Sequence, residues 1–225
     1  MRFLLALLLL VSSRPAQAGF CRDILNQFFR RIVSRTHLGS GENGSVDLVD
    51  YSNGTKKVIK SYGYDSEYAR DIEVRSSRYL QAVTKGVVGL RVARFKKAFS
   101  LTRTLAEVEY IEGRPLQKPY STESLLEDAA VSAQYHKILE EIVLSVVNDP
   151  KFEYFTFENQ YNQAISLNRT QLKDGLPADL KAKIGSNRIF LHVKRRGENE
   201  LYSVFLKPTN FVLTAAGDLG IIDPY

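Results

Sequence analysis

Three glycines and a valine form a pattern that suits the binding of phosphate groups. Gly39, Gly41, Gly44 and Val46 follow the spacing G-x-G-x-x-G-x-V. Because glycine has no side chain, backbone N–H groups in such a segment can approach phosphate oxygens closely. A strand and not a helix is expected after the glycines, which disfavours a dinucleotide site of the Rossmann type. The segment predicts a phosphate-binding loop between two strands; a glycine-rich hairpin tip without a ligand is the alternative.

A lysine and a carboxylate follow at a spacing that fits the same kind of ligand. Lys60 ends the stretch Val58-Ile59-Lys60, from which an ammonium group could reach phosphate oxygens if the hairpin folds back over them. The next predicted helix, residues 66–83, supplies Glu73 as the partner of Lys60, with Glu67 as the alternative. Without a ligand, the same residues would be an exposed strand lysine and a solvated helix face.

Two side chains near the C-terminal end are candidate magnesium ligands. Asn210 follows Leu206-Lys207-Pro208-Thr209, and Asp223 follows the apolar run 219–222. Carboxylate and amide oxygens suit Mg²⁺ that is held between phosphate groups. We therefore expect Asn210 and Asp223 at two adjacent strand ends.

A Gly/Pro connector after an apolar strand is a candidate for base recognition. Residues 109–116 read Glu-Tyr-Ile-Glu-Gly-Arg-Pro-Leu. Backbone groups near Glu109 and Ile111, with Val108 beside them, could hydrogen-bond the edge of an adenine. A plain linker between a strand and a helix is the alternative.

The elements that must position these residues follow from hydrophobic periodicity and turn signals. The first half predicts a helix at 20–32, a hairpin with strands at 45–51 and 57–61, a helix at 66–83, and strands at 89–101 and 104–111. The second half predicts a helix that starts with a Ser124–Glu127 capping box and stops at Pro150. It also predicts a helix within 158–172 and strands at 188–196, 201–206, 211–214 and 219–222.

In this order, the segments resemble the protein kinase superfamily, and the resemblance spans Leu38 to Asp223. It implies an α+β, two-lobed protein-kinase-like fold. An N-terminal helix (19–36) would precede an N-lobe of antiparallel sheet with one helix (37–112) and a short, mainly helical C-lobe (113–225). It also implies ATP and Mg²⁺ as ligands. Lys60 would hold the α- and β-phosphates, Glu73 would orient Lys60, and Asn210 and Asp223 would bind magnesium.

The sequence departs from the family at two places. The family's catalytic loop reads H-R-D-L-K-P-x-N, and its Asp accepts the proton of the substrate hydroxyl. Here Phe205 stands at that position, with Lys207 nearby, and phenylalanine cannot accept a proton. The metal-binding D-F-G becomes Asp223-Pro224-Tyr225, and no activation loop or peptide-binding helices follow in this sequence.

Three functional hypotheses follow. The favoured one is an exported, kinase-like protein that binds ATP and Mg²⁺ and acts as a pseudokinase or regulator, through a protein partner. The second is an active atypical kinase for a small molecule, a sugar or a lipid headgroup, because positioning and electrostatics supply most of phosphoryl-transfer catalysis. The third is a secreted interaction module without nucleotide. Whether the protein is an enzyme is left open.

Composition and the N-terminal residues bear on location. The 225 residues are 44% hydrophobic and 25% charged, as in ordinary globular proteins. Residues 1–18 carry Arg2, an apolar run and Ala16-Gln17-Ala18, which predicts a secretory signal peptide and a secreted or periplasmic protein. The apolar run is shorter than the roughly 20 residues of a membrane span, so no transmembrane segment is expected.

The charge pattern and the single cysteine exclude two further classes. No dense Lys/Arg run marks a nucleic-acid-binding protein, and the densest basic cluster is Lys194-Arg195-Arg196. Cys21 is the only cysteine, so an intramolecular disulfide is impossible. We interpret Cys21 as a free or intermolecular thiol.

Overall fold

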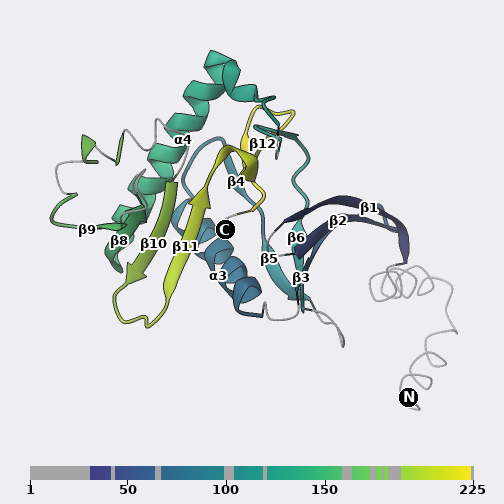
Figure 1. Cartoon of the computed structure of the whole chain (residues 1–225), viewed down its shortest axis with the longest axis horizontal. Coiled ribbons are helices and arrows are strands. Elements are labelled where there is room, and N and C mark those ends of the chain that lie inside the picture. Colours follow the sequence, from purple (N-terminus) through teal and green to yellow (C-terminus); the bar gives the residue numbers. More distant parts are fainter. Residues whose placement is uncertain are drawn as a thin grey trace, which may run out of the picture.

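The computed structural model describes residues 31–41, 44–63, 67–98, 104–118, 121–158, 164–172, 176–178, 180–181 and 189–223. The described part of the chain is α+β: two α-helices, α3 (Glu67–Val83) and α4 (Ala129–Asn148), pack against antiparallel sheets (Figure 1). The predicted signal peptide and Cys21 lie outside the described residues. Strand β1 begins at Ile32, so residues 32–36 of the predicted N-terminal helix form a strand instead, and residues 19–30 lie outside the described part.

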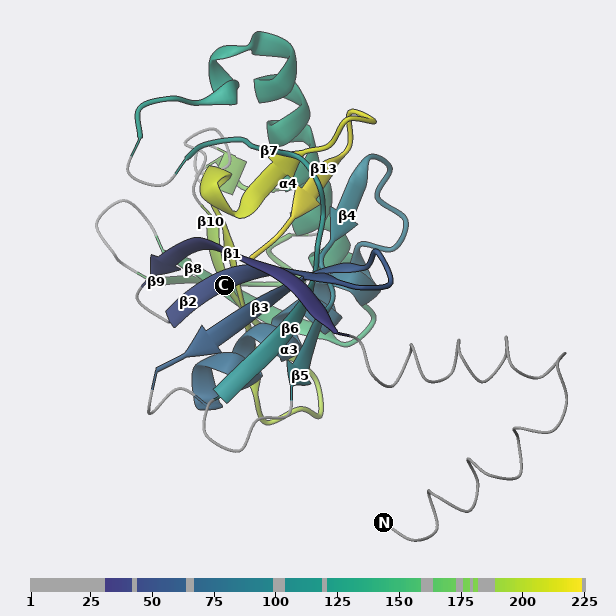
Figure 2. The same ribbon diagram turned by 90° about the vertical axis from the view of Figure 1, so that its right-hand side faces the viewer.

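A five-stranded antiparallel sheet carries the glycine-rich segment. Figure 2 shows β1 at the outer edge of this sheet. One face packs on α3 through a cluster that includes Tyr62, Val74, Phe95 and Ala106. The strand order is β1 (Ile32–Gly41), β2 (Gly44–Tyr51), β3 (Lys56–Tyr62), β6 (Thr104–Glu109) and β5 (Phe95–Ala98).

A second antiparallel sheet and α4 enclose the larger core. Buried side chains alternate along its strands, as expected for a sheet with one covered face, and Leu139, Phe155 and Leu191 are fully buried in this core. Helix α3 lies between the two sheets, since its other side packs on β11. The strand order is β11 (Leu201–Leu206), β10 (Ile189–Arg195), β8 (Phe152–Glu158) and β9 (Ala164–Asn168).

A small third sheet joins distant parts of the chain. Its central hairpin has a parallel neighbour, β4, on one side and an antiparallel neighbour, β7, on the other. The order is β4 (Leu90–Val92), β13 (Leu219–Ile221), β12 (Phe211–Leu213) and β7 (Arg114–Pro115). This sheet brings the end of the described chain, beyond β13, back to the segment between α3 and β5.

The second half of the chain differs from the prediction. The expectation of a mainly helical region at residues 113–225 is wrong, because α4 is the one long helix among its described residues and seven strands accompany it. The helix predicted within 158–172 is also wrong. Strand β8 runs to Glu158, and β9 occupies Ala164–Asn168. Strand β8 is rich in aromatic residues, which favour strands, and its pairing with β10 and β9 outweighs the helical spacing further on.

The start of α4 is also shifted from the predicted capping box. The Ser124 hydroxyl accepts a hydrogen bond from the Leu126 N–H (3.2 Å) and caps only a 3₁₀ turn, Leu125–Glu127. Asp128 is the N-cap of α4, since its carboxylate accepts from the Ala130 N–H at 2.8 Å. Among the described residues, no helix is long and apolar enough to cross a membrane.

Gly44 should be intolerant of any side chain. Its φ is +138°, and a Cβ there would lie 1.8 Å from the carbonyl oxygen of Ser61 on β3. Because β2 and β3 must separate to admit a methyl group, we expect Gly44→Ala to lower the free energy of unfolding by about 2 kcal/mol or more. Gly63→Ala is the control, because a Cβ there meets nothing within 4 Å. Urea unfolding that gives equal stabilities for the two variants would contradict the prediction.

Candidate functional site

Lys60 lies at the centre of the five-stranded sheet with its side chain toward α3. Its strand, β3, pairs with β2 on one side and β6 on the other, so that Lys60 stands opposite Val46 and Ala106. Residues directly opposite one another share a face of the sheet, and Ala106 belongs to the cluster that packs on α3. Lys60 is only 7% exposed. The flanking strands and the helix thus fix where its ammonium group lies.

The Lys60 ammonium group joins two carboxylates that are remote in the sequence. Its Nζ lies 2.7 Å from Glu73 Oε1 on α3 and 3.0 Å from Asp223 Oδ2 beyond β13. The predicted Lys60–Glu73 pair is therefore present in the structure. The alternative partner, Glu67, is exposed in the first turn of α3. The sequence analysis named Asp223 as a metal ligand only, and its contact with Lys60 was not foreseen.

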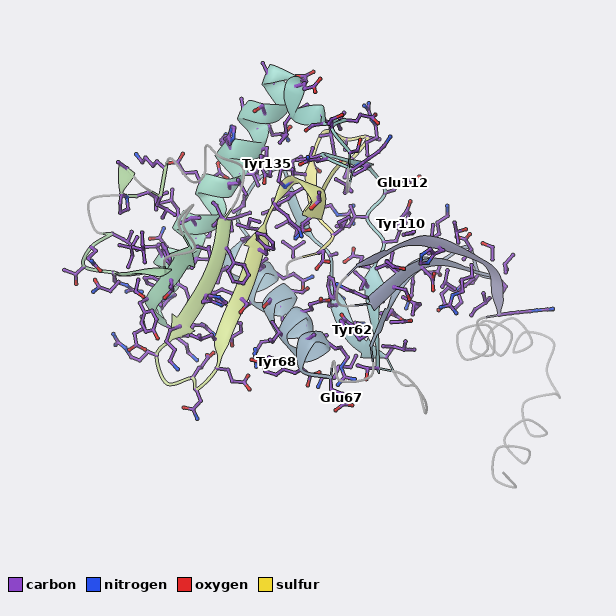
Figure 3. All side chains as sticks on the ribbon, in the orientation of Figure 1. Tyr62, Glu67, Tyr68, Tyr110, Glu112 and Tyr135 are labelled. Atoms are coloured by element: carbon purple, nitrogen blue, oxygen red, sulfur yellow. The ribbon has the colours of Figure 1, made fainter. Side chains whose placement is uncertain are left out.

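Tyr62 completes the surroundings of Glu73. The Tyr62 hydroxyl donates a hydrogen bond of 2.5 Å to Glu73 Oε2, and Glu73 is fully buried. Tyr62, labelled in Figure 3, lies between the sheet and α3. Both carboxylate oxygens of Glu73 thus have a donor. Sequence reasoning missed Tyr62, although its position two residues after Lys60 on the same strand indicates that it shares a face with the lysine.

One ammonium group faces two carboxylates in this site, and the charge of Arg70 also acts on Tyr62. Burial, together with the negative charge of Asp223, raises the pKa of Glu73 to about 7, although Lys60 and Tyr62 act in the opposite direction. Burial disfavours the ammonium form of Lys60, but the charges of Asp223 and Glu73 outweigh it and raise the pKa of Lys60. Burial and the charge of Glu73 raise the pKa of Tyr62, so its hydroxyl stays a donor.

Asn210 lies beside the strand that leads to Asp223. It ends a short 3₁₀ helix, Pro208–Asn210, and its backbone oxygen accepts from the Ile222 N–H at 2.9 Å. Its side-chain Nδ2 donates to the carbonyl oxygen of Phe205 (2.9 Å), which orients the amide. Asn210 is 4% exposed, whereas the Asp223 side chain is 34% exposed. The structure therefore brings the two predicted magnesium ligands to adjacent strands.

The oxygen ligands of Asn210 and Asp223 supply part of the coordination that a magnesium ion needs. Among the described residues, no group of three or more His, Cys, Asp or Glu side chains is placed to hold a metal ion. A carboxylate and an amide oxygen are ligands that Mg²⁺ accepts, and Mg²⁺ is commonly bound by one or two carboxylates plus the phosphates of a substrate. Asn210 and Asp223 fit this second kind of site.

Phe205, which the resemblance places at the family's catalytic Asp, has an aromatic ring that packs against its neighbours. The ring is half-buried and meets the Phe190 ring edge-to-face, with 5.2 Å between centroids. Lys207 Nζ lies 4.7 Å from the Phe205 ring centroid, a favourable cation–π distance. The surroundings of Phe205 therefore offer packing contacts and a cation, and Phe205 itself has no group that takes up a proton.

The glycine-rich segment forms the end of the β1–β2 hairpin. Gly39 stands opposite Val46, and Gly41 stands opposite Gly44; residues 42 and 43 lie outside the described part. Val46 shares the face of Lys60. The predicted hairpin of residues 45–51 and 57–61 is confirmed as β2 and β3, whereas Gly39 and Gly44 lie within β1 and β2 and not in a loop between strands.

The segment after β6 is anchored to its neighbours by charge and packing. The Glu109 carboxylate accepts from Arg91 Nη2 (3.2 Å) and from the Arg94 N–H (3.3 Å). Val108 and Ile111 are buried, and a Cβ on Gly220 would lie 2.8 Å from Ile111 Cγ2. Tyr110 and Glu112, labelled in Figure 3, lie on the connection that follows. The segment after β6 is therefore held against β13, the strand that precedes Asp223 in the chain.

Comparisons with known proteins give little beyond this geometry. No family model matches the sequence, and no curated protein matches it. Among solved structures, the chain is similar to the complex of Rv3197 with erythromycin from Mycobacterium tuberculosis, at a TM-score of 0.40 and 14% identity. The match covers 97% of this chain and 53% of that one, so the chain spans about half the length of that protein. We draw nothing on fold or function from a likeness of this degree.

Removing the Lys60 cation should destabilise the fold more than removing a neighbouring lysine. Lys60→Met leaves two carboxylates facing each other, one of them fully buried, so we expect the free energy of unfolding to fall by about 3 kcal/mol. Lys57→Met removes an ion pair with Glu107 that is nearer the surface and should cost less than about 1 kcal/mol. Adding Glu73→Gln to Lys60→Met should recover part of the loss. Equal losses for Lys60→Met and Lys57→Met in urea unfolding would refute the prediction.

The raised pKa of Glu73 predicts a pH-dependent stability. Between pH 4.5, its ordinary pKa, and about pH 7, the folded state keeps a proton that the unfolded state releases. The free energy of unfolding from this group therefore falls as the pH rises through this range, by about 3 kcal/mol at most. Glu73→Gln lacks this titration, so its stability should decline less between pH 4.5 and 7.5. Urea unfolding across this range tests the difference, and parallel curves for variant and wild type would count against it.

Proposed function

We propose that this is an exported protein of protein-kinase-like, two-lobed fold that binds ATP and Mg²⁺ and acts as a pseudokinase or regulator. The observation that carries the proposal is the Lys60 ammonium group between Glu73 and Asp223. Burying the charges of Lys60 and Glu73 costs free energy that a hydrophobic core would not. A buried lysine beside a partly exposed carboxylate is understandable if a divalent cation and a polyphosphate bind there.

The surrounding residues support the same ligand. In this proposal Lys60 contacts the α- and β-phosphates, Glu73 and Tyr62 hold Lys60 in place, and the oxygens of Asp223 and Asn210 bind magnesium. Bound magnesium would neutralise phosphate charge. The adenine and phosphates would lie against residues from the glycine hairpin and the segment after β6: Gly39, Gly41, Gly44, Val46, Val108, Glu109 and Ile111.

Phe205 decides between a regulator and an enzyme in this proposal. A general base contributes typically 10²- to 10⁴-fold to a rate, and the side chain of Phe205 cannot act as one. Nucleotide binding needs no base, so a protein that binds ATP and signals through a partner is consistent with the residues present. An atypical kinase for a small molecule, sugar or lipid headgroup would need a carboxylate or imidazole from elsewhere. Export rests on the signal peptide predicted for residues 1–18.

Nucleotide binding is tested by thermal unfolding with and without ATP and Mg²⁺. Ligand at about 100 times its dissociation constant should stabilise the protein by about 2.7 kcal/mol, which raises Tm by a few degrees. Asp223→Asn should abolish the magnesium-dependent part of this shift. Asp218→Asn is the matched control, because Asp218 lies in the turn between β12 and β13 and has no role in the proposed site.

The outcomes separate the three hypotheses. A shift lost in Asp223→Asn, with no transfer of phosphate from radiolabelled ATP, supports the pseudokinase. The same shift with labelled product supports the atypical kinase. No shift up to millimolar ATP overturns both and leaves an interaction module.

A further inference from the structure

A serine, a histidine and an aspartate form a hydrogen-bonded row on the β1–β2 hairpin. Ser40 Oγ lies 3.2 Å from His37 Nε2, and His37 Nδ1 lies 2.9 Å from Asp47 Oδ1. A nucleophile within hydrogen-bond reach of a base, which is itself oriented by a third group, is the arrangement that activates a serine hydroxyl. Ser40 and His37 are exposed, so a reagent can reach them.

A β-bulge brings Ser40 and His37 together. The register of β1 against β2 shifts between His37 and Gly39, so that Leu38 is the extra residue. In a regular strand, residues three apart point to opposite faces. With the bulge, His37 stands opposite Asp47 and Ser40 stands opposite Ser45, and both lie on one face. Bulges near functional sites change in this way the face of the sheet to which side chains point.

Asp47 is built to hold the histidine. Asp47 is 8% exposed, and its other carboxylate oxygen accepts from Arg35 Nε (2.9 Å) and Nη2 (2.5 Å). The hydrogen bonds from His37 and Arg35 lower the pKa of Asp47, so its carboxylate remains ionised. An ionised carboxylate at Nδ1 places the Nε2 lone pair toward Ser40 and stabilises the imidazolium that forms when the ring takes a proton.

A groove adjoins this row on the same face of the sheet. It encloses about 570 Å³, and Arg35, which binds Asp47, is part of its lining. The apolar side chains of Val49, Ile59 and Leu105 contribute to the same lining, together with the charged Lys97 and Glu107. Ser61 also lines the groove; it is 9% exposed, and its Oγ is buried with no hydrogen-bond partner in the described structure. A buried hydroxyl without a partner is costly unless a ligand supplies one.

We propose that Ser40 is a nucleophile that takes the acyl group of an ester whose apolar chain lies in this groove. Ser40 Oγ attacks the carbonyl carbon, and its proton passes to His37 Nε2. The bond from that carbon to the leaving alcohol oxygen then breaks, and the alcohol takes the proton from His37. Ser40 is left as an ester, and no other reactant is needed.

Ser40 lies between Gly39 and Gly41 of the proposed nucleotide site, but its side chain lies on the face of the sheet opposite Lys60. Asp47 stands opposite Ile59, and the next pair along is Val46 with Lys60. Successive residues of a strand point to opposite faces, so Lys60 and the Ser40 row lie on opposite faces of the sheet. Loss of nucleotide binding therefore leaves the serine chemistry intact, and the two proposals can fail separately.

The test uses p-nitrophenyl octanoate with the full chain. We expect one octanoyl group per chain, located on Ser40 by peptide mass spectrometry, with release of one p-nitrophenolate. Ser40→Ala should remove the modification. His37→Gln, which keeps Ser40, should slow acylation at least tenfold. Asp218→Asn, in the turn between β12 and β13, should react like the wild type. Ser34 is the internal control, since its hydroxyl contacts Asp50 (2.5 Å) without a histidine, and it should stay unmodified.

The length of the acyl chain tests the role of the groove. The octanoate ester should acylate Ser40 at least tenfold faster than the acetate ester, because only the longer acyl chain reaches the apolar side chains of the groove. Equal rates for the two esters would overturn the role of the groove. Acyl groups found only on lysines, or an unchanged rate in His37→Gln, would overturn the nucleophile.

Discussion

The ammonium group of Lys60 is the interaction on which the arrangement of this protein depends. It joins β3, α3 and the segment after β13 through two carboxylates that no local element could bring together. A buried ion pair adds little net stability compared with apolar packing, but breaking it by removing one partner is costly. The interaction therefore constrains the geometry of the fold. The sheet, the helix and the C-terminal hairpin must be placed so that these three charged groups meet.

Helix α3 meets this constraint because it is held from two sides. Toward the five-stranded sheet it contributes Val74 to a buried cluster, and toward the second sheet it contributes Leu80 to the main core. The Tyr79 ring stacks on Tyr202 of β11 at 4.5 Å between centroids, and Arg75 pairs with Glu200 of the β10–β11 turn. The position of Glu73 is thus set by contacts on both flanks of the helix and not by Lys60 alone.

The two faces of the five-stranded sheet have different chemistry because successive residues alternate between them. One face carries Lys60 among apolar residues that pack on α3, where its ammonium group pairs with two carboxylates. The other carries His37, Asp47 and Ser40 beside a partly apolar groove. The bulge at Leu38 reverses the face to which the following residues of β1 point, so that Ser40 lies on the same face as His37.

The sequence by itself determined the β2–β3 hairpin, α3 with its Glu73, the strands that flank Asn210 and Asp223, and the α+β class, because alternation and helical spacing are properties of neighbouring residues. Only the tertiary structure decided the rest. It made Phe152–Glu158 and Ala164–Asn168 strands, placed the Tyr62 hydroxyl against Glu73, and paired Lys60 with Asp223. It also placed the bulge that unites Ser40 with His37. Each of these depends on pairing between remote segments, and a shift of one residue in that pairing would move every side chain to the other face.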